Sequence, residues 1–261
     1  MDSVEAKSHR SMSEIDAGLW RTCFGDGDPF LGWDFLHGLE ASGCTTTENG
    51  WQPAHLSIEL SGETAGMMPT YLKDHSYGEY VFDWSWADAW QRMGLQYYPK
   101  LVTAVPFTPA TGQRLGHVDH QQISAPRLVD AVKALTDTLG VSSWHVLFLD
   151  EASSRELCEC DMPQRLTTQF HWFNHGYRDF QDFLDRFSSR KRKNLRRERE
   201  RIAEQGLSIK TLKGDEIASE HWQFFYHCYQ TTYAKRSGHG GYLTKAFFTE
   251  TCPLLGQSPV M

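Results

Sequence analysis

A basic segment carries the clearest chemical signal in this 261-residue sequence. Residues 186–201 hold nine Lys or Arg and two Glu, a net charge of nine minus two, or +7, in a chain whose net charge is -7. At about 100° per residue, Arg192, Arg196 and Arg199 form one stripe of a helix, and Lys191 lies on the neighbouring apolar stripe. Guanidinium groups pair with phosphate oxygens, so the stripe predicts a site for a diphosphate, a nucleotide or an RNA backbone. The alternative is a solvated helix face.

A second group of residues could move protons. Glu79 and Asp83 stand in the aromatic run 77–90, where burial would raise a carboxyl pKa toward a range useful for accepting the proton of an amine. Tyr77 and Tyr98 are candidates for protonating a leaving group. The alternative is a core strand with a capping Asp.

A third group could line a cleft and bind anions. Phe107 lies between two prolines, which favour a stiff, extended segment that cannot fully join a sheet. Lys100 and Arg114 flank this segment and could contact anions. Trp84 and Trp172 are the other candidates for lining the cleft. The alternative for the segment around Phe107 is a loop at a sheet edge.

Composition excludes several functional classes. Mean hydropathy is -0.52, and no apolar run reaches the length of about 18 residues that spans a membrane. The N-terminus is polar and lacks a signal-like apolar stretch, which predicts a cytoplasmic protein. The six Cys lack zinc-site spacing, so we expect free thiols and no metal site.

Hydrophobic periodicity predicts a mixed, layered α/β (α+β) fold. We expect a loose lead-in over residues 1–28, a first domain over 29–155 and a partial second domain over 156–261 that contains the basic helix. Predicted helices cover residues 30–39, 125–139, 180–204 (one helix or two) and 215–235. Predicted strands cover residues 55–60, 65–73, 80–86, 101–107, 144–149, 166–173 and 207–212.

Several blocks of the sequence are distinctive, at residues 29–31, 75–84, 97–100, 104–109, 169–172, 190–197 and 242–244. Together these blocks resemble the FemAB-like (peptidoglycan biosynthesis/recognition) family of the GNAT acyltransferase superfamily. The resemblance implies two GNAT-like domains with a cleft between them, and transfer of an acyl or aminoacyl group to an amine. In the wider Fem group, a Lys-x-Arg-x-x-Ile-Arg segment lies near a phosphate-bearing substrate, and its matching positions here are Arg190, Arg192, Leu195 and Arg196.

The resemblance also sets the expected partners. We expect no tightly bound cofactor, acyl-CoA or aminoacyl-tRNA as co-substrate, and a small-molecule or peptide amine with a phosphate as acceptor, such as a cell-wall precursor. The similarity fades after Phe248, so the second GNAT-like domain is expected to be incomplete, as in a fragment. Two alternatives stay open: an RNA (tRNA)-binding module that uses the basic helix, and a truncated, inactive recognition domain. Donor, acceptor and oligomeric state are left open.

Overall fold

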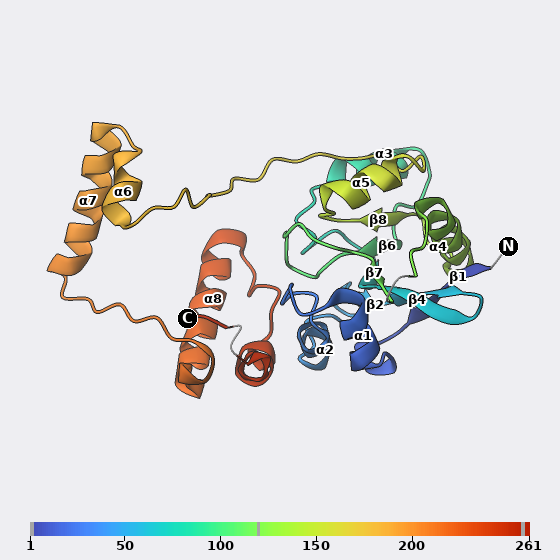
Figure 1. Cartoon of the computed structure of the whole chain (residues 1–261), viewed down its shortest axis with the longest axis horizontal. Coiled ribbons are helices and arrows are strands. Elements are labelled where there is room, and N and C mark those ends of the chain that lie inside the picture. Colours follow the sequence, from blue (N-terminus) through green and yellow to red (C-terminus); the bar gives the residue numbers. More distant parts are fainter. Residues whose placement is uncertain (1–2, 119–120, 257–258) are drawn as a thin grey trace. The chain divides into compact units, whose positions relative to one another are not determined.

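The structure is a computed structural model that describes residues 3–118, 121–256 and 259–261. Contacts between residues divide the chain into two compact units (Figure 1). The larger unit is formed by Met1–Gln164 together with Lys213–Met261, and the smaller by Arg165–Leu212. The aromatic run 77–90, with Glu79 and Asp83, therefore lies in the larger unit, and the basic segment 186–201 lies in the smaller one.

The first sheet of the larger unit is antiparallel, with the strand order β1-β3-β4-β7. Strands β3 and β4 form the predicted hairpin, and Ser61 and Gly62 at its turn have φ angles of 53° and 90°. The alternating pattern of the sequence thus predicts β3 correctly. The strands are β1 (Val4–His9), β3 (His55–Leu60), β4 (Glu63–Met68) and β7 (Gly116–His117).

The second sheet has the strand order β2-β5-β6-β8, in which only the β6–β8 pair is parallel among the described strands. Pro69 separates β4 from β5, and it cannot donate a hydrogen bond to a ladder. The strand predicted over residues 65–73 is therefore two strands that lie in different sheets. The members of this sheet are β2 (Gln52–Pro53), β5 (Thr70–Lys73), β6 (Lys100–Thr103) and β8 (Trp144–Val146).

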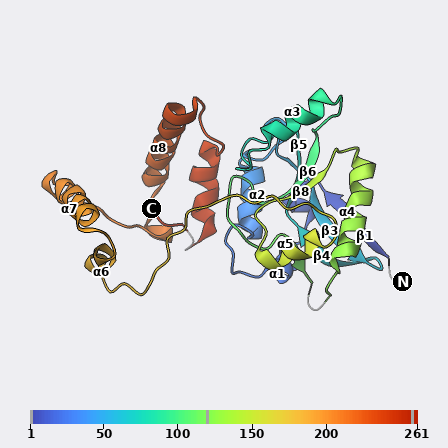
Figure 2. The same ribbon diagram turned by 90° about the horizontal axis from the view of Figure 1, so that it is seen from above.

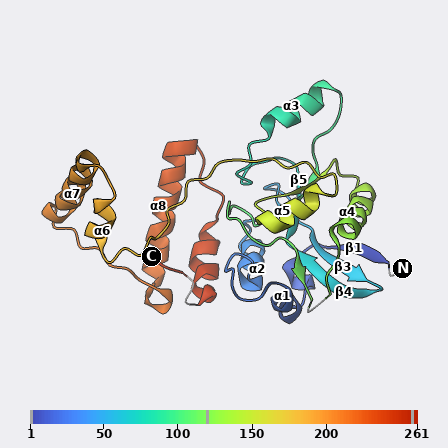
Figure 3. The ribbon, with the colours of Figure 1, turned by 45° about the horizontal axis from the view of Figure 1, so that its top comes forward.

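Helices flank both sheets, which confirms the predicted mixed α/β class. Helix α4 packs against β1 (Figure 2), and its Leu128 and Val132 join Leu56 and Ile58 in the main core. No side chain of α3 is buried, and Figure 3 shows this helix at the periphery. The α-helices of the larger unit are α1 (Ala17–Phe24), α2 (Trp33–Ala41), α3 (Trp84–Arg92), α4 (Ala125–Leu139), α5 (Glu151–Cys158) and α8 (Ser219–Ser237).

The predicted loose lead-in over residues 1–28 is wrong. Strand β1 pairs with β3 along its whole length, and the short helix η1 (Met12–Glu14) follows it. Met12 and Trp20 are buried with Leu36 in a second core cluster, so this segment is part of the fold. The strand predicted over residues 80–86 is also wrong, because the chain forms a loop there and then enters α3.

The C-terminal segment packs on α2, although sequence analysis placed it in a second domain. Thr251 donates a hydrogen bond to the carbonyl of Gly38 at 3.2 Å, and Thr244 donates one to the carbonyl of Ser42 at 2.8 Å. A Cβ atom at Gly38 would lie 2.1 Å from a methyl carbon of Thr251, so this close packing requires glycine. The chain therefore does not divide at the expected boundary between residues 155 and 156. The remaining short helices are η2 (Gly214–Glu216), η3 (Phe247–Thr251) and η4 (Cys252–Leu255).

The smaller unit contains two helices, α6 (Phe180–Asp185) and α7 (Ser189–Glu204), which is the second of the two alternatives predicted for residues 180–204. The strands predicted over residues 166–173 and 207–212 do not form, because no described strand pairs with either segment. Most of their apolar side chains are exposed, and Phe170 is fully so. Among the described residues of both units, no helix is long and apolar enough to cross a membrane.

Candidate functional site

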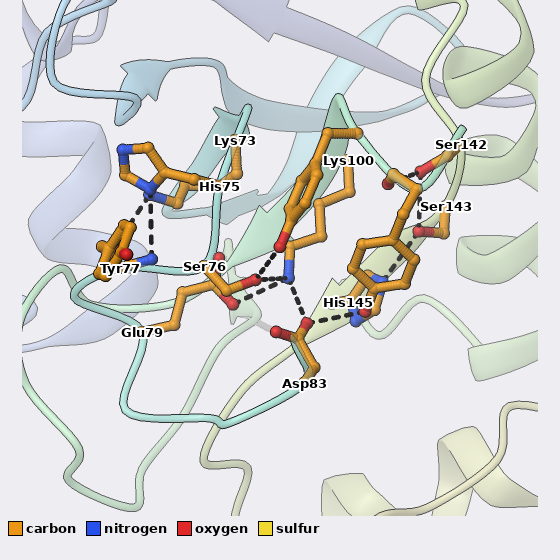
Figure 4. Close-up of polar contacts among 12 residues, drawn as sticks. Lys73, His75, Ser76, Tyr77, Glu79, Asp83, Lys100, Ser142, Ser143 and His145 are labelled. Carbon is orange, nitrogen blue, oxygen red and sulfur yellow. Dashed lines mark hydrogen bonds and ion pairs between the residues drawn. The ribbon is translucent and has the colours of Figure 1, made fainter. Parts of the chain in front are cut away.

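A buried lysine organises the candidate site. Lys100 is the first residue of β6, and its side chain is 0% exposed. Its Nζ atom donates hydrogen bonds to Ser76 Oγ at 2.9 Å, Glu79 Oε2 at 2.9 Å and Asp83 Oδ2 at 2.6 Å (Figure 4). These three contacts use every proton of the ammonium group. The loop from β5 to α3 is thereby folded back over the start of β6.

The two carboxylates of this network have different electrostatic environments. Burial raises the pKa of Glu79, although Lys100 opposes this effect. Burial would also raise the pKa of Asp83, but hydrogen bonds from Lys100, Ser76 and Tyr97 outweigh this effect and lower the pKa. The Tyr97 hydroxyl donates to Asp83 at 2.7 Å. Glu79 is thus the carboxylate that more readily takes up a proton. Glu79 Oε1 and Asp83 Oδ1 are buried without a hydrogen-bond partner among the described residues.

Of the two candidate tyrosines, Tyr98 is joined to the network. Its hydroxyl lies 2.8 Å from Ser76 Oγ, its side chain is half-buried, and burial raises its pKa. The Tyr77 side chain is 57% exposed, and its ring contacts that of Trp84 at 4.9 Å. The structure therefore brings Glu79, Asp83, Tyr98 and Lys100 together. The Tyr77 ring packs on Trp84 and does not join this network.

Sequence analysis missed two titratable residues close to this network. Lys73 pairs with Lys100 across β5 and β6, and its Nζ lies 3.8 Å from the centre of the Trp51 ring. Burial lowers the pKa of Lys73 to about 7. His145 contacts Ser143 Oγ at 2.8 Å, and burial lowers its pKa to about 4. The position of Lys73 at the end of the apolar strand β5 was the available signal in the sequence.

Aromatic residues from distant segments meet beside the network. Phe107 has a φ angle of 57°, and its ring stacks on that of Tyr242 at a centroid distance of 5.2 Å and an angle of 11°. The hydroxyls of Tyr80 and Tyr233 lie 3.3 Å apart. The Tyr242 ring also lies 6.4 Å from that of Tyr80, so both α8 and the segment after it pack against the loop that carries Glu79.

The structure places Arg114 in the interior, away from the anion-binding role expected of it. Arg114 is 1% exposed. Its guanidinium donates to the backbone carbonyls of Leu147 at 2.9 Å, Gln113 at 2.8 Å and Ala110 at 2.6 Å. All three nitrogens bind the protein backbone, so we correct the role of Arg114 to that of a structural residue.

In the smaller unit, the predicted arginine stripe faces α6. Arg192 pairs with Asp185 at 3.1 Å, Arg196 donates to Gln181 at 2.7 Å, and Arg199 lies 4.1 Å from the centre of the Phe180 ring. Lys191 is exposed on α7. A second set of exposed cations has no hydrogen bond, ion pair or ring contact with the described part of the chain. Its members are Arg190, Lys193, Arg197 and Arg201.

Trp172, the third residue expected to line a cleft, also belongs to the smaller unit. Its side chain is 64% exposed. It borders an open hollow of about 360 Å³, which is also lined by Asn174, Tyr177, Asp179, Phe180 and Phe183. The expected cleft residues are therefore divided: Trp84 and Phe107 belong to the larger unit, and Trp172 borders this separate hollow.

Comparison with known proteins identifies one family. The FemAB-like family model, described as peptidoglycan biosynthesis/recognition, matches residues 11–261. No curated protein matches the chain. A solved structure, the aminoglycoside N-acetyltransferase AAC(6')-Iy in complex with CoA, aligns with a TM-score of 0.36 and 10% sequence identity, over 68% of this chain and 97% of that chain.

Proposed function

The chain belongs to the FemAB-like family, and on this premise we propose that it is an N-acyltransferase that moves an acyl or aminoacyl group onto an amine. The observation that carries the proposal is the buried network in which one lysine holds two carboxylates with different electrostatic environments. Such a pair can keep one carboxylate ionised while the other exchanges a proton. The network also includes a half-buried phenol, Tyr98.

The proposed chemistry needs one proton acceptor and one proton donor. The acceptor amine attacks the carbonyl carbon of the donor, and the C–S or C–O bond to the donor then breaks. Glu79 is the proposed destination of the amine proton, because burial raises its pKa. Tyr98 is the proposed proton donor to the leaving group, with Tyr77 as the alternative. Holding the two substrates together supplies a large part of the rate enhancement.

We propose that the basic stripe of α7 binds a phosphate-bearing substrate through Arg192, Arg196 and Arg199, with Lys191 beside them. Nine basic residues in the short segment 186–201 support this role. Both candidate donors, acyl-CoA and aminoacyl-tRNA, carry phosphates. The family description supports a cell-wall precursor as the acceptor. In the free protein the stripe contacts α6, so binding of a phosphate would share or replace these contacts.

A transfer assay with the full chain tests the proposed function. Labelled acetyl-CoA or aminoacyl-tRNA is incubated with the protein and a nucleotide-linked peptide that has a free amine, and the amide product is identified by mass spectrometry. We expect the amide to form with one of the two donors. Salt-sensitive binding of RNA with no transfer from either donor would instead support the RNA-binding alternative.

A further inference from the structure

The most reactive groups of the network are not accessible to a substrate. Glu79 and Asp83 are 2% and 4% exposed, and Lys100 is 0% exposed. Tyr98, by contrast, is only half-buried. A general base must lie within hydrogen-bond distance of the proton that it removes, directly or through an intermediate group. The amine proton therefore needs a route from the surface to Glu79.

A continuous chain of hydrogen bonds provides such a route (Figure 4). The Tyr98 hydroxyl lies 2.8 Å from Ser76 Oγ, which lies 2.9 Å from Lys100 Nζ, which lies 2.9 Å from Glu79 Oε2. Among the described residues, the Ser76 side chain is the one that hydrogen-bonds to both Tyr98 and Lys100. We infer that Ser76 and Lys100 relay protons between Tyr98, which touches the substrate, and Glu79, which stores the proton. This inference rests on the proposed function.

The relay conserves atoms and charge. The acceptor ammonium gives a proton to Tyr98 as Tyr98 passes its own proton to Ser76. Lys100 first passes one of its three protons to Glu79; its Nζ then has a lone pair, turns toward Ser76 and takes the hydroxyl proton of Ser76, so Lys100 keeps its charge and Glu79 becomes neutral. The freed amine attacks the acyl carbon and the bond to the donor breaks. The stored proton then returns along the same path to the leaving sulfur or oxygen, and the second proton lost by the nitrogen goes to solvent.

The remaining contacts of the network suit this relay. Asp83 accepts hydrogen bonds from both Lys100 and Tyr97, and these lower its pKa. Asp83 therefore stays ionised and balances the charge of Lys100 while Glu79 is neutral. Ser76 is 3% exposed, so water does not readily replace its hydroxyl in the series of hydrogen bonds from Tyr98 to Glu79.

Ser76→Ala breaks the series of hydrogen bonds between Tyr98 and Lys100. The effect on the relay is measured with two acceptor amines of different basicity. An alkylamine is protonated at neutral pH and needs the relay, whereas methoxyamine is already neutral and does not. With labelled acetyl-CoA or aminoacyl-tRNA as donor, we expect Ser76→Ala to lower kcat for the alkylamine at least about tenfold and to change KM less than about twofold. Transfer to methoxyamine should change less than about twofold.

Two variants serve as controls. Ser76→Thr keeps the hydroxyl and should restore most of the kcat for the alkylamine. Ser85→Ala removes an exposed hydroxyl of α3 and should match the wild type with both acceptors. Equal losses with both acceptors, or no loss with either, would overturn the relay while leaving the acyltransferase proposal standing. Failure of the wild type to acylate either amine from either donor would overturn both.

Discussion

Two lysines that face each other across β5 and β6 show how differently one residue type can be accommodated. Like charges in directly opposed positions of neighbouring strands are unfavourable. Lys100 is compensated by two carboxylates, Glu79 and Asp83. Lys73 has the face of the Trp51 ring and one carbonyl, that of Tyr77 at 3.3 Å. Burial lowers the pKa of Lys73 to about 7.

The lowered pKa of Lys73 predicts a pH-dependent stability. Between pH 7, near its folded pKa, and its ordinary pKa of 10.5, the unfolded chain binds more protons at this position than the folded chain. The free energy of unfolding contributed by Lys73 therefore rises as the pH rises through this window. Lys73→Met removes this contribution, so its stability advantage over the wild type should shrink between about pH 7 and about pH 10 in urea unfolding.

The exposed Lys133 of α4 gives the matched control for this experiment. Lys133→Met removes the same charge without removing a buried ammonium group. Its stability difference from the wild type should stay nearly constant over the same pH range. A constant difference for Lys73→Met as well would show that Lys73 is not held in an environment that disfavours its charge.

At the scale of single elements, local sequence signals predicted helices better than they predicted the loop between β5 and α3, which carries Glu79 and Asp83. Helix α4 begins after Ser124, with Pro126 in its first turn, and ends at Gly140, which has a φ angle of 65°. These are local signals, and the predicted bounds of 125–139 are confirmed. The loop before α3 has the aromatic composition of a strand, but Gly78 and Tyr80 have φ angles of 79° and 58°. Such angles are incompatible with a strand and depend on tertiary contacts.

The candidate site was predictable in its residue types but not in its connections. Glu79, Asp83, Tyr98 and Lys100 were each predicted from composition or resemblance, yet for different tasks. The structure places Lys100 on the two carboxylates, where it has no donor left for a substrate anion. Ser76 could not be predicted, because its position depends on a contact with Lys100, 24 residues away in the sequence.

The two sides of α7 offer a direct test of the proposed phosphate site. Arg192→Ala with Arg196→Ala should weaken binding of a phosphate-bearing donor at least about tenfold, measured by titration calorimetry. Lys193→Ala with Arg197→Ala removes the same charge from exposed positions whose side chains contact no described residue, and is the matched control.

The control pair should weaken binding less than about threefold, because it removes only long-range attraction. The melting curve should hardly change in either variant, because the contacts of these residues are exposed. Equal losses of affinity in the two variants would point to general charge attraction. A larger loss of affinity in the control pair would assign the phosphate site to the other side of α7.

At the scale of the whole molecule, charge and core are unevenly distributed. Residues 165–212 carry twelve Lys or Arg and six Asp or Glu, a net charge of +6, so the rest of the chain carries -7 minus +6, or -13. Leu184 is the one buried side chain of this smaller unit, whereas the larger unit contains the core clusters. The smaller unit thus has little buried apolar area to hold its helices.

This distribution predicts two levels of local stability. Backbone amides of α7 should exchange with deuterium at least about a hundredfold faster than those of α4, measured by mass spectrometry of peptic peptides. Comparable protection of the two helices would show that α7 is stabilised by more than its contacts with α6. A phosphate-bearing donor should slow exchange in α7 if its arginines bind it.

The measurement that most directly tests the central claim is acyl transfer by the full chain with and without the Glu79 carboxylate. Glu79→Gln keeps the size of the side chain but removes the proton acceptor, and Glu63→Gln makes the same change at an exposed position of the β3–β4 hairpin. We predict amide formation by the wild type and Glu63→Gln, and a rate at least about a hundredfold lower for Glu79→Gln. Equal rates for all three proteins would contradict a catalytic role for the buried network, and no transfer by any of them would contradict the proposed function itself.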